Sequence, residues 1–121
     1  MTDITATIQT KIADELATAL LSSARAQVAT AQAEAAEDAG DDTTAAAHEE
    51  RMLSANTAAS EARRRAELVI ETAQACGVHV GDALRIAAET EALDQPAGAG
   101  KTIRDAVAEL EDQARAIRSG K

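Results

Sequence analysis

The sequence predicts an all-α protein, in which a long, alanine-rich antiparallel helical hairpin similar to a coiled coil is followed by two shorter helices in a single domain, 1–121. Three observations predict this class. Alanine, the residue with the highest helix propensity, makes up 32 of the 121 residues, and Phe, Tyr and Trp are absent. Apolar residues recur at intervals of three and four, as on one face of a helix. The single proline and the six glycines lie between these periodic segments or near the end of the chain.

The first helix is expected over about residues 3–38. Thr2 can cap it, and no helix-breaking residue follows before Gly40. Its apolar residues follow one another at steps of four: Ile4, Ile8, Ile12, Leu16, Leu20, Ala24 and Val28. Each step of four advances the stripe by about 40 degrees around the helix. The stripe therefore winds, which favours one neighbour at the N-terminal half of the helix and another further along.

The second helix is expected over about residues 44–76, after a turn at Gly40, with Asp42, Thr43 or Thr44 as its cap. Its spacing is the most regular in the chain, alternating steps of four and three through His48, Met52, Ala55, Ala59, Ala62, Ala66, Val69, Ala73 and Cys76. Gly77 is a suitable stop. Two helices of about 50 Å joined by a short turn favour an antiparallel hairpin.

Two shorter helices complete the prediction. The third is expected over about residues 82–94, with Leu84, Ile86, Ala87, Ala88 and Leu93 as its apolar set. Pro96, Gly98 and Gly100 then predict a flexible loop. The fourth helix is expected over about residues 102–118, where Thr102 and Asp105 form a capping pair. Its apolar residues again follow four-three spacing: Ile103, Val107, Leu110, Ala114 and Ile117.

Large apolar residues are scarce, because Ile, Leu and Val together supply only 20 residues. Burial of so few large side chains leaves a thin core, so we expect the helix 2 and helix 4 seams to be buried between chains. The predicted interaction seam consists of Met52, Ala55, Ala59, Ala62, Ala66, Val69, Ala73, Ile103, Val107, Leu110, Ala114 and Ile117. The leading hypothesis is a non-enzymatic structural or adaptor protein that forms a homo-oligomer or binds another helical protein.

The charge balance gives a second hypothesis. The chain carries 21 Asp and Glu against 12 Lys and Arg, a formal charge of −9, and it has no aromatic residues for stacking on bases. Both facts argue against direct binding of nucleic acid. An acidic decoy or inhibitor could instead occupy a basic, nucleic-acid-binding protein surface. Its contact face would be residues 1–42, which hold eight acidic and two basic residues.

The segment Gln95-Pro96-Ala97-Gly98-Ala99-Gly100-Lys101-Thr102 resembles the phosphate-binding loop of P-loop NTPases, G-x-x-x-x-G-K-[ST], with Gln95 in place of the first glycine. The resemblance implies that backbone N–H groups near Gly100 would wrap phosphates, with Lys101 on the outer phosphates and Thr102 on magnesium. In that family the loop follows a buried parallel strand, whereas here an acidic helix precedes it. The other interpretation is a glycine-rich linker whose Thr102 caps the fourth helix, and nucleotide binding is a third, remote alternative.

The remaining polar candidates predict no catalytic, metal or cofactor site. Arg63, Arg64 and Arg65 spread around a helix and are expected to form a solvated face, with the pairs Glu61–Arg65 and Arg63–Glu67. His48 has no second histidine at metal-ligand spacing, His79 is expected in a loop, and Cys76 is expected to be buried.

Targeting signals are also absent from the sequence. The start MTDITATIQTK has neither the basic nor the apolar region of a signal peptide, and the longest uncharged run near it, residues 16–24, is too short to span a membrane. A single cysteine excludes an intrachain disulfide. We expect a cytoplasmic protein with no membrane partner.

Overall fold

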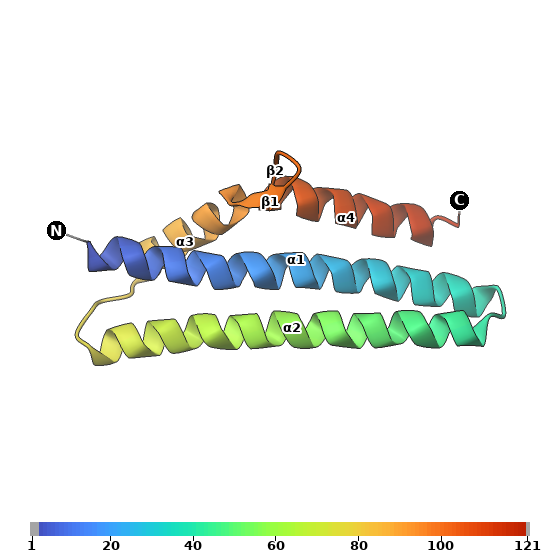
Figure 1. Cartoon of the computed structure of the whole chain (residues 1–121), viewed down its shortest axis with the longest axis horizontal. Helices are drawn as coiled ribbons and strands as arrows, with labels where there is room; N and C mark the ends of the chain where they lie inside the picture. Colours follow the sequence, from blue (N-terminus) through green and yellow to red (C-terminus); the bar gives the residue numbers. More distant parts are fainter. Residues whose placement is uncertain (1–2, 121) are drawn as a thin grey trace.

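The computed structural model describes residues 3–120 and confirms the predicted fold class (Figure 1). Two long helices, α1 (Ile4–Asp38) and α2 (Asp42–Ala75), lie side by side in antiparallel directions. Two shorter helices follow, α3 (Asp82–Asp94) and α4 (Ile103–Arg118), with the short strands β1 (Pro96–Gly98) and β2 (Lys101–Thr102) between them. Below, the open end of the hairpin is where α1 begins and α2 ends, and the turn end is where α1 meets α2.

The caps of the two long helices differ from those predicted. Asp3 caps α1, since its carboxylate accepts a hydrogen bond from the Thr5 amide at 3.0 Å, and the predicted cap, Thr2, lies outside the described residues. Asp41 caps α2 and accepts bonds from the Thr44 amide at 3.1 Å and the Thr44 hydroxyl at 2.6 Å. The cap predicted at Asp42, Thr43 or Thr44 was wrong because Gly40, at φ +77°, closes the turn within three residues, so α2 starts earlier.

The end of α2 forms as the sequence predicts. Gly77 adopts φ +85°, and the Val78 amide donates to the Ala73 carbonyl at 2.9 Å while the Gly77 amide donates to Gln74 at 3.0 Å. This pair of bonds satisfies carbonyls at the helix end and turns the chain back toward α1. Val80 then becomes buried as α3 begins.

α1 is the central helix of the molecule, because α2, α3 and α4 all pack on it and α2 has no comparable contact with α3 or α4. Ile8 and Ile12 belong to the same apolar cluster as Ala88 and Ala92 of α3. Further along, Val28 and Ala31 pack with Ala114 of α4. The winding apolar stripe on this helix therefore has the two successive neighbours that its spacing predicts (Figure 1).

The core is thick at the open end and thin at the turn end. Ile8, Ile12, Ile70 and Val80 are buried together at the open end. Between the long helices the buried residues toward the turn are small. They include Ala26, Ala29 and Ala33 on α1 and Ala45 and Ala59 on α2. Alanines let two helices approach closely but bury little area per residue, so most of the apolar stabilisation is expected at the open end.

The segment predicted as a flexible loop is a small β-hairpin. Strand β1 pairs with β2 in antiparallel fashion, with Pro96 opposite Thr102 and Gly98 opposite Lys101. The tight reversal is possible because Gly98, Ala99 and Gly100 all have positive φ, at 92°, 55° and 74°. These strands give no recognisable sequence signal because each is only two or three residues long.

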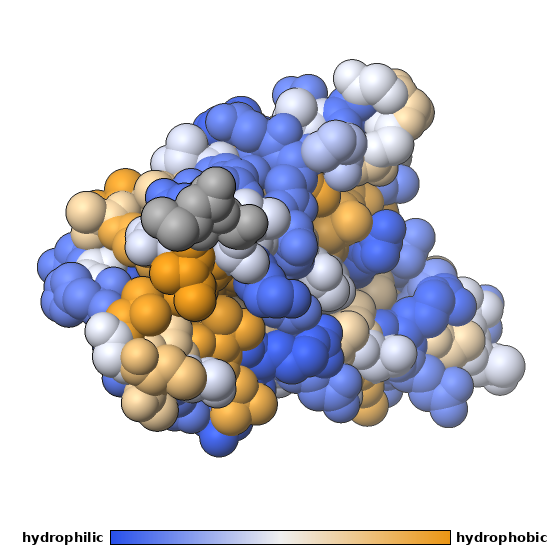
Figure 2. Space-filling model, turned by 60° about the vertical axis from the view of Figure 1, so that its left-hand side comes forward, coloured by the Kyte–Doolittle hydropathy of each residue, from blue (hydrophilic) through white to orange (hydrophobic). Residues whose placement is uncertain are grey.

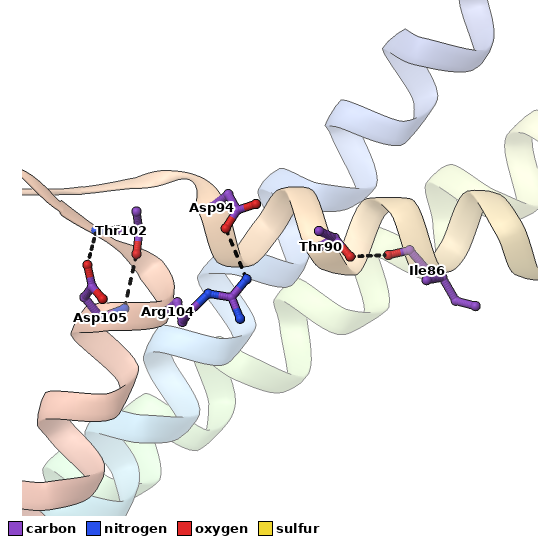
Figure 3. A network of polar contacts seen from close by, with 6 residues as sticks. All are labelled: Ile86, Thr90, Asp94, Thr102, Arg104 and Asp105. Carbon is purple, nitrogen blue, oxygen red and sulfur yellow. Dashed lines mark hydrogen bonds and ion pairs between the residues drawn. The ribbon is translucent and has the colours of Figure 1, made fainter.

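Polar contacts join the end of α3 to the start of α4 (Figure 3). Arg104 pairs with Asp94 at 3.1 Å, and the Ile103 amide donates to the Gln95 carbonyl at 2.8 Å. Thr102 accepts a bond from the Asp105 amide, and the Asp105 carboxylate accepts one from the Thr102 amide. The capping pair predicted for the fourth helix is thereby confirmed.

No helix within residues 3–120 has an apolar stretch long enough to cross a bilayer.

Candidate interaction surface

The predicted seams lie inside the chain. On α2, Ala59, Ala62, Ala66 and Ala73 are buried, and Met52, Ala55 and Val69 are partly buried. On α4, Ile103 and Ala114 are buried, and Val107, Leu110 and Ile117 are partly buried. α1 packs against both helices, whereas the spacing and the thin core predicted that other chains cover these seams.

The reason for this difference is a second buried face on α1. Ala19, Ala26 and Ala33 recur every seven residues and are all buried. This face was not predicted from the sequence, since alanine carries little signal about burial. Because α1 has two buried faces, one for α2 and one for the shorter helices, a single chain covers most of its own seams. Three seam residues, Ala55, Val69 and Ala73, also line hollows on the surface of the hairpin that are open to another molecule.

An apolar groove remains open between α1 and α2 at the open end. It has a volume of about 420 Å³ and is lined by Ile4, Thr7, Ile8, Lys11, Leu68, Val69, Thr72, Ala73, Cys76 and Val78. Ile4 and Leu68 are 59% and 44% exposed. In the space-filling view, apolar surface gathers at this end of the molecule (Figure 2).

The same flank of the hairpin is hollowed again toward the turn end. This second stretch also has a volume of about 420 Å³ and is lined by Ser22, Arg25, Ala29, Gln32, Arg51, Ser54, Ala55 and Ala58. Lys11 and Arg25 are two heptads apart on α1, as are Ala58 and Thr72 on α2, so both stretches face the same side. We call the two stretches together the hairpin groove.

An ion pair crosses the hairpin groove between its two stretches. The Arg65 guanidinium of α2 lies 2.5 Å from the Glu15 carboxylate of α1. It joins the two helices where the apolar part of the groove gives way to the part lined by alanine, serine and arginine.

The opposite flank of the hairpin is covered by α3. A smaller cleft there is lined by Ile12, Leu16, Arg63, Ala66, Glu67, Ile70, Arg85 and Glu89, which come from α1, α2 and α3. Among the described residues, neither stretch of the hairpin groove is lined by a residue of α3 or α4. The hairpin groove is therefore the flank of the hairpin that the chain leaves uncovered.

The three consecutive arginines are exposed, as predicted, and each also makes a polar contact. Arg63 donates to the Ser23 hydroxyl of α1 at 2.8 Å, Arg65 pairs with Glu15, and Arg64 pairs with Glu71 at 3.7 Å. The predicted pairs Glu61–Arg65 and Arg63–Glu67 do not appear among the ion pairs of residues 3–120. The first and third arginines lie on either side of the α1 contact, so their long side chains reach across it.

Within residues 3–120, neither Cys76 nor the histidines belong to a group of side chains that could hold a metal ion. Cys76 is exposed, contrary to prediction, because α2 ends at Ala75 and Cys76 is its C-terminal cap. It borders the open-end stretch of the groove. His48 lies beside the Arg51 guanidinium, and His79 is exposed in the connection to α3.

Lys101 and Thr102, the residues that resemble a phosphate-binding loop, have structural partners. The Lys101 ammonium lies 2.6 Å from the Glu109 carboxylate, and the Thr102 hydroxyl accepts the Asp105 amide. Gly100 belongs to the turn of the β-hairpin, and the strand before it, β1, is short and paired antiparallel rather than buried and parallel. This is the geometry of the alternative interpretation, a linker that caps α4.

The turn end is crowded with carboxylates. Glu37 and Asp38 end α1, Asp41 and Asp42 begin α2, and Glu49 lies one to two turns further on. A hydrogen bond with Glu49 and the charge of that residue raise the pKa of Glu37. The hydroxyl and amide of Thr44 lower the pKa of Asp41. The turn end therefore brings together five acidic residues of α1, α2 and the turn between them.

Compared with protein-family models, with curated proteins and with solved structures, the chain matches none of them.

Proposed function

We propose that the protein is a non-enzymatic structural or adaptor protein that acts through helix–helix association, and that the hairpin groove is its contact surface. The observation that carries this proposal is the open-end stretch, where exposed Ile4 and Leu68 flank a concave apolar surface. Large apolar residues gathered around a hollow are typical of surfaces on which another apolar surface docks.

A helix is the shape that suits this groove. The groove runs between two antiparallel helices, and from Ile4 to Gln32 it extends for about 42 Å at 1.5 Å per residue. A third helix can lie along it with apolar residues at steps of three and four against the open end. The small side chains of the second stretch, such as Ala29 and Ala58, permit close approach.

Apolar burial supplies the favourable free energy of this association. Covering Ile4 and Leu68 would remove two large, half-exposed side chains from water, and each contributes about 1–2 kcal/mol. The partner would be a second copy, giving a homo-oligomer, or a helix of another protein. Either would add apolar contacts to a chain with few large apolar residues of its own.

Two measurements test this proposal. Light scattering on a size-exclusion column at tens of micromolar reports self-association. Titration with a labelled amphipathic peptide, with leucine at its heptad core and glutamine at the flanks, reports partner-helix binding. Leu68→Glu is expected to weaken whichever association is found. Leu53→Glu, on the same helix at 60% exposure but outside the groove, is expected to leave it unchanged. A monomer that binds no such peptide would contradict the proposal.

The acidic turn end supports a second candidate function, that of a decoy for a basic protein surface. The raised pKa of Glu37 reflects carboxylates crowded closely enough to disfavour one another's charge. A cationic partner relieves this repulsion. Binding of an oligolysine probe should fall steeply with added salt and weaken in Glu37→Gln. Glu67→Gln, which lies away from the turn end, serves as the control. If both variants bind oligolysine equally well, the turn end is not the contact surface.

A further inference from the structure

The hairpin groove is basic although the chain as a whole is acidic. Lys11, Arg25 and Arg51 line its two stretches, and no Asp or Glu is among the lining residues. Carboxylates outnumber cations by 21 to 12 in the chain, so a surface of average composition would be acidic. The groove is therefore more positively charged than the average surface, and a positively charged surface attracts carboxylates.

These cations are largely free to meet a partner. Within residues 3–120, Lys11 and Arg25 take part in no ion pair, and Arg51 contacts the ring nitrogen Nδ1 of His48 with one of its five N–H donors. Asp14, one turn beyond Lys11, accepts a hydrogen bond from Gln95 at 2.7 Å, and it lines a separate hollow together with Asp3 and Lys11. Arg65, between the two stretches, is already neutralised by Glu15.

The same face of a second copy would not suit this groove. In a two-fold dimer formed groove to groove, the cations of one copy would oppose those of the other, and like charges in a contact are unfavourable. The rest of the described surface offers no second apolar stripe either, since the other exposed large apolar residues, Leu53 and Ile86, lie singly on α2 and α3.

We infer that the hairpin groove binds an acidic amphipathic helix of another protein, which places its apolar face on the open-end stretch and its carboxylates beside Lys11, Arg25 and Arg51. This inference rests on the proposed function and names the chemistry of the partner. The apolar end provides affinity, whereas the cations along the groove select for charge and fix the register of the bound helix.

The experiment compares two labelled peptides of about four heptads, both with leucine at the core positions. One carries glutamate at the flanking positions and the other carries lysine. Fluorescence anisotropy at low salt should show that the glutamate peptide binds about tenfold more tightly, and the ratio should shrink as salt is added. Leu68→Glu should weaken both peptides, because both use the apolar end.

Charge reversal in the groove supplies the matched test. Arg25→Glu should reduce the glutamate-to-lysine ratio several-fold, whereas Arg64→Glu, an equal change of charge on an exposed arginine outside the groove, should leave it unchanged. Circular dichroism checks that each variant keeps its helices, and Arg51→Glu repeats the test at a second position.

Each outcome bears on one proposal or both. A ratio near one, or a ratio that neither Arg25→Glu nor Arg51→Glu alters, overturns the acidic-helix inference and leaves helix association in place if Leu68→Glu still weakens binding. Failure of both peptides and of the glutamine peptide to bind, together with a monomeric wild type, overturns the inference and the proposed function together.

Discussion

Ala99 adopts a left-handed backbone conformation, with φ 55°, between two glycines that do the same. A side chain at this φ is strained because its Cβ approaches the following carbonyl oxygen. The strain is tolerated because the two-residue turn, Ala99-Gly100, lets β1 pair with β2 and sets Thr102 at the start of α4.

Replacing Ala99 by glycine should therefore stabilise the protein. Relief of strain exceeds the added freedom of the unfolded chain, so we expect a gain of about 0.5–1 kcal/mol in the free energy of unfolding. Urea denaturation followed by circular dichroism measures it. Ala46→Gly, the same change on the exposed face of α2, should cost about 1 kcal/mol, and a loss of stability in both variants would contradict the turn geometry.

Glu37 should make stability depend on pH. Its raised pKa means that the folded state binds this proton more tightly, so the contribution is stabilising below the ordinary value of 4.5 and is lost as pH rises through the folded pKa. Glu37→Gln should raise the urea midpoint at neutral pH. It should also make the midpoint depend less on pH just above pH 4.5. A midpoint that is unchanged at neutral pH would show that the Glu49 contact is not formed.

Asp41 should make stability depend on pH in the direction opposite to Glu37. Its lowered pKa contributes stability above the ordinary value of 3.8, and that stability is lost as pH falls through the folded pKa. Asp41→Ala should lower the urea midpoint at neutral pH, and the difference from wild type should disappear in strong acid. The same deficit at both pH values would show that the carboxylate charge is not what caps α2.

At the scale of the element, the contact between α1 and α2 depends on small side chains. Ala62 is fully buried in the middle of α2. Ala62→Leu should force the helices apart and cost about 1–3 kcal/mol, whereas Ala46→Leu, at an exposed position, should change stability by less than about 0.5 kcal/mol. Urea denaturation of both variants checks this, and equal midpoints would mean that α1 does not approach α2 closely.

Helix positions followed from the sequence because breakers and caps act locally. The bounds of α3 match the prediction, and Gly77 ends α2 as expected. Burial was harder to predict, because alanine carries almost no signal about which side of a helix it occupies. Ala62 is buried and Ala46 is exposed, yet both lie on the same helix. Ile86 belongs to the apolar set predicted for the third helix, but it is 60% exposed.

The candidate groove could not be read from the sequence for a related reason. Ile4, Leu68 and Arg25 lie far apart in the chain, and only the antiparallel register of α1 and α2 brings them onto one flank. The regular four-three spacing identified the seam residues as residues that contact another helix. Such a pattern does not show which helix makes the contact.

At the scale of the whole molecule, the uneven core predicts uneven stability. Large buried residues gather at the open end, whereas the turn end holds Val28, Ala31 and Ala114 with few larger neighbours. Local opening should therefore begin at the turn end, so amides in residues 45–55 should exchange with deuterium about tenfold faster than those in residues 62–73. Mass spectrometry after proteolysis measures this difference, and uniform protection along α2 would contradict it.

The position of α1 in the chain governs the order in which the protein can assemble during synthesis. Every other helix rests on α1, yet it leaves the ribosome first, when none of them exists. The high alanine content lets this segment hold helical turns before any partner is made. Each helix translated later can then pack against α1, which is already helical, so folding can proceed while the chain is being synthesised.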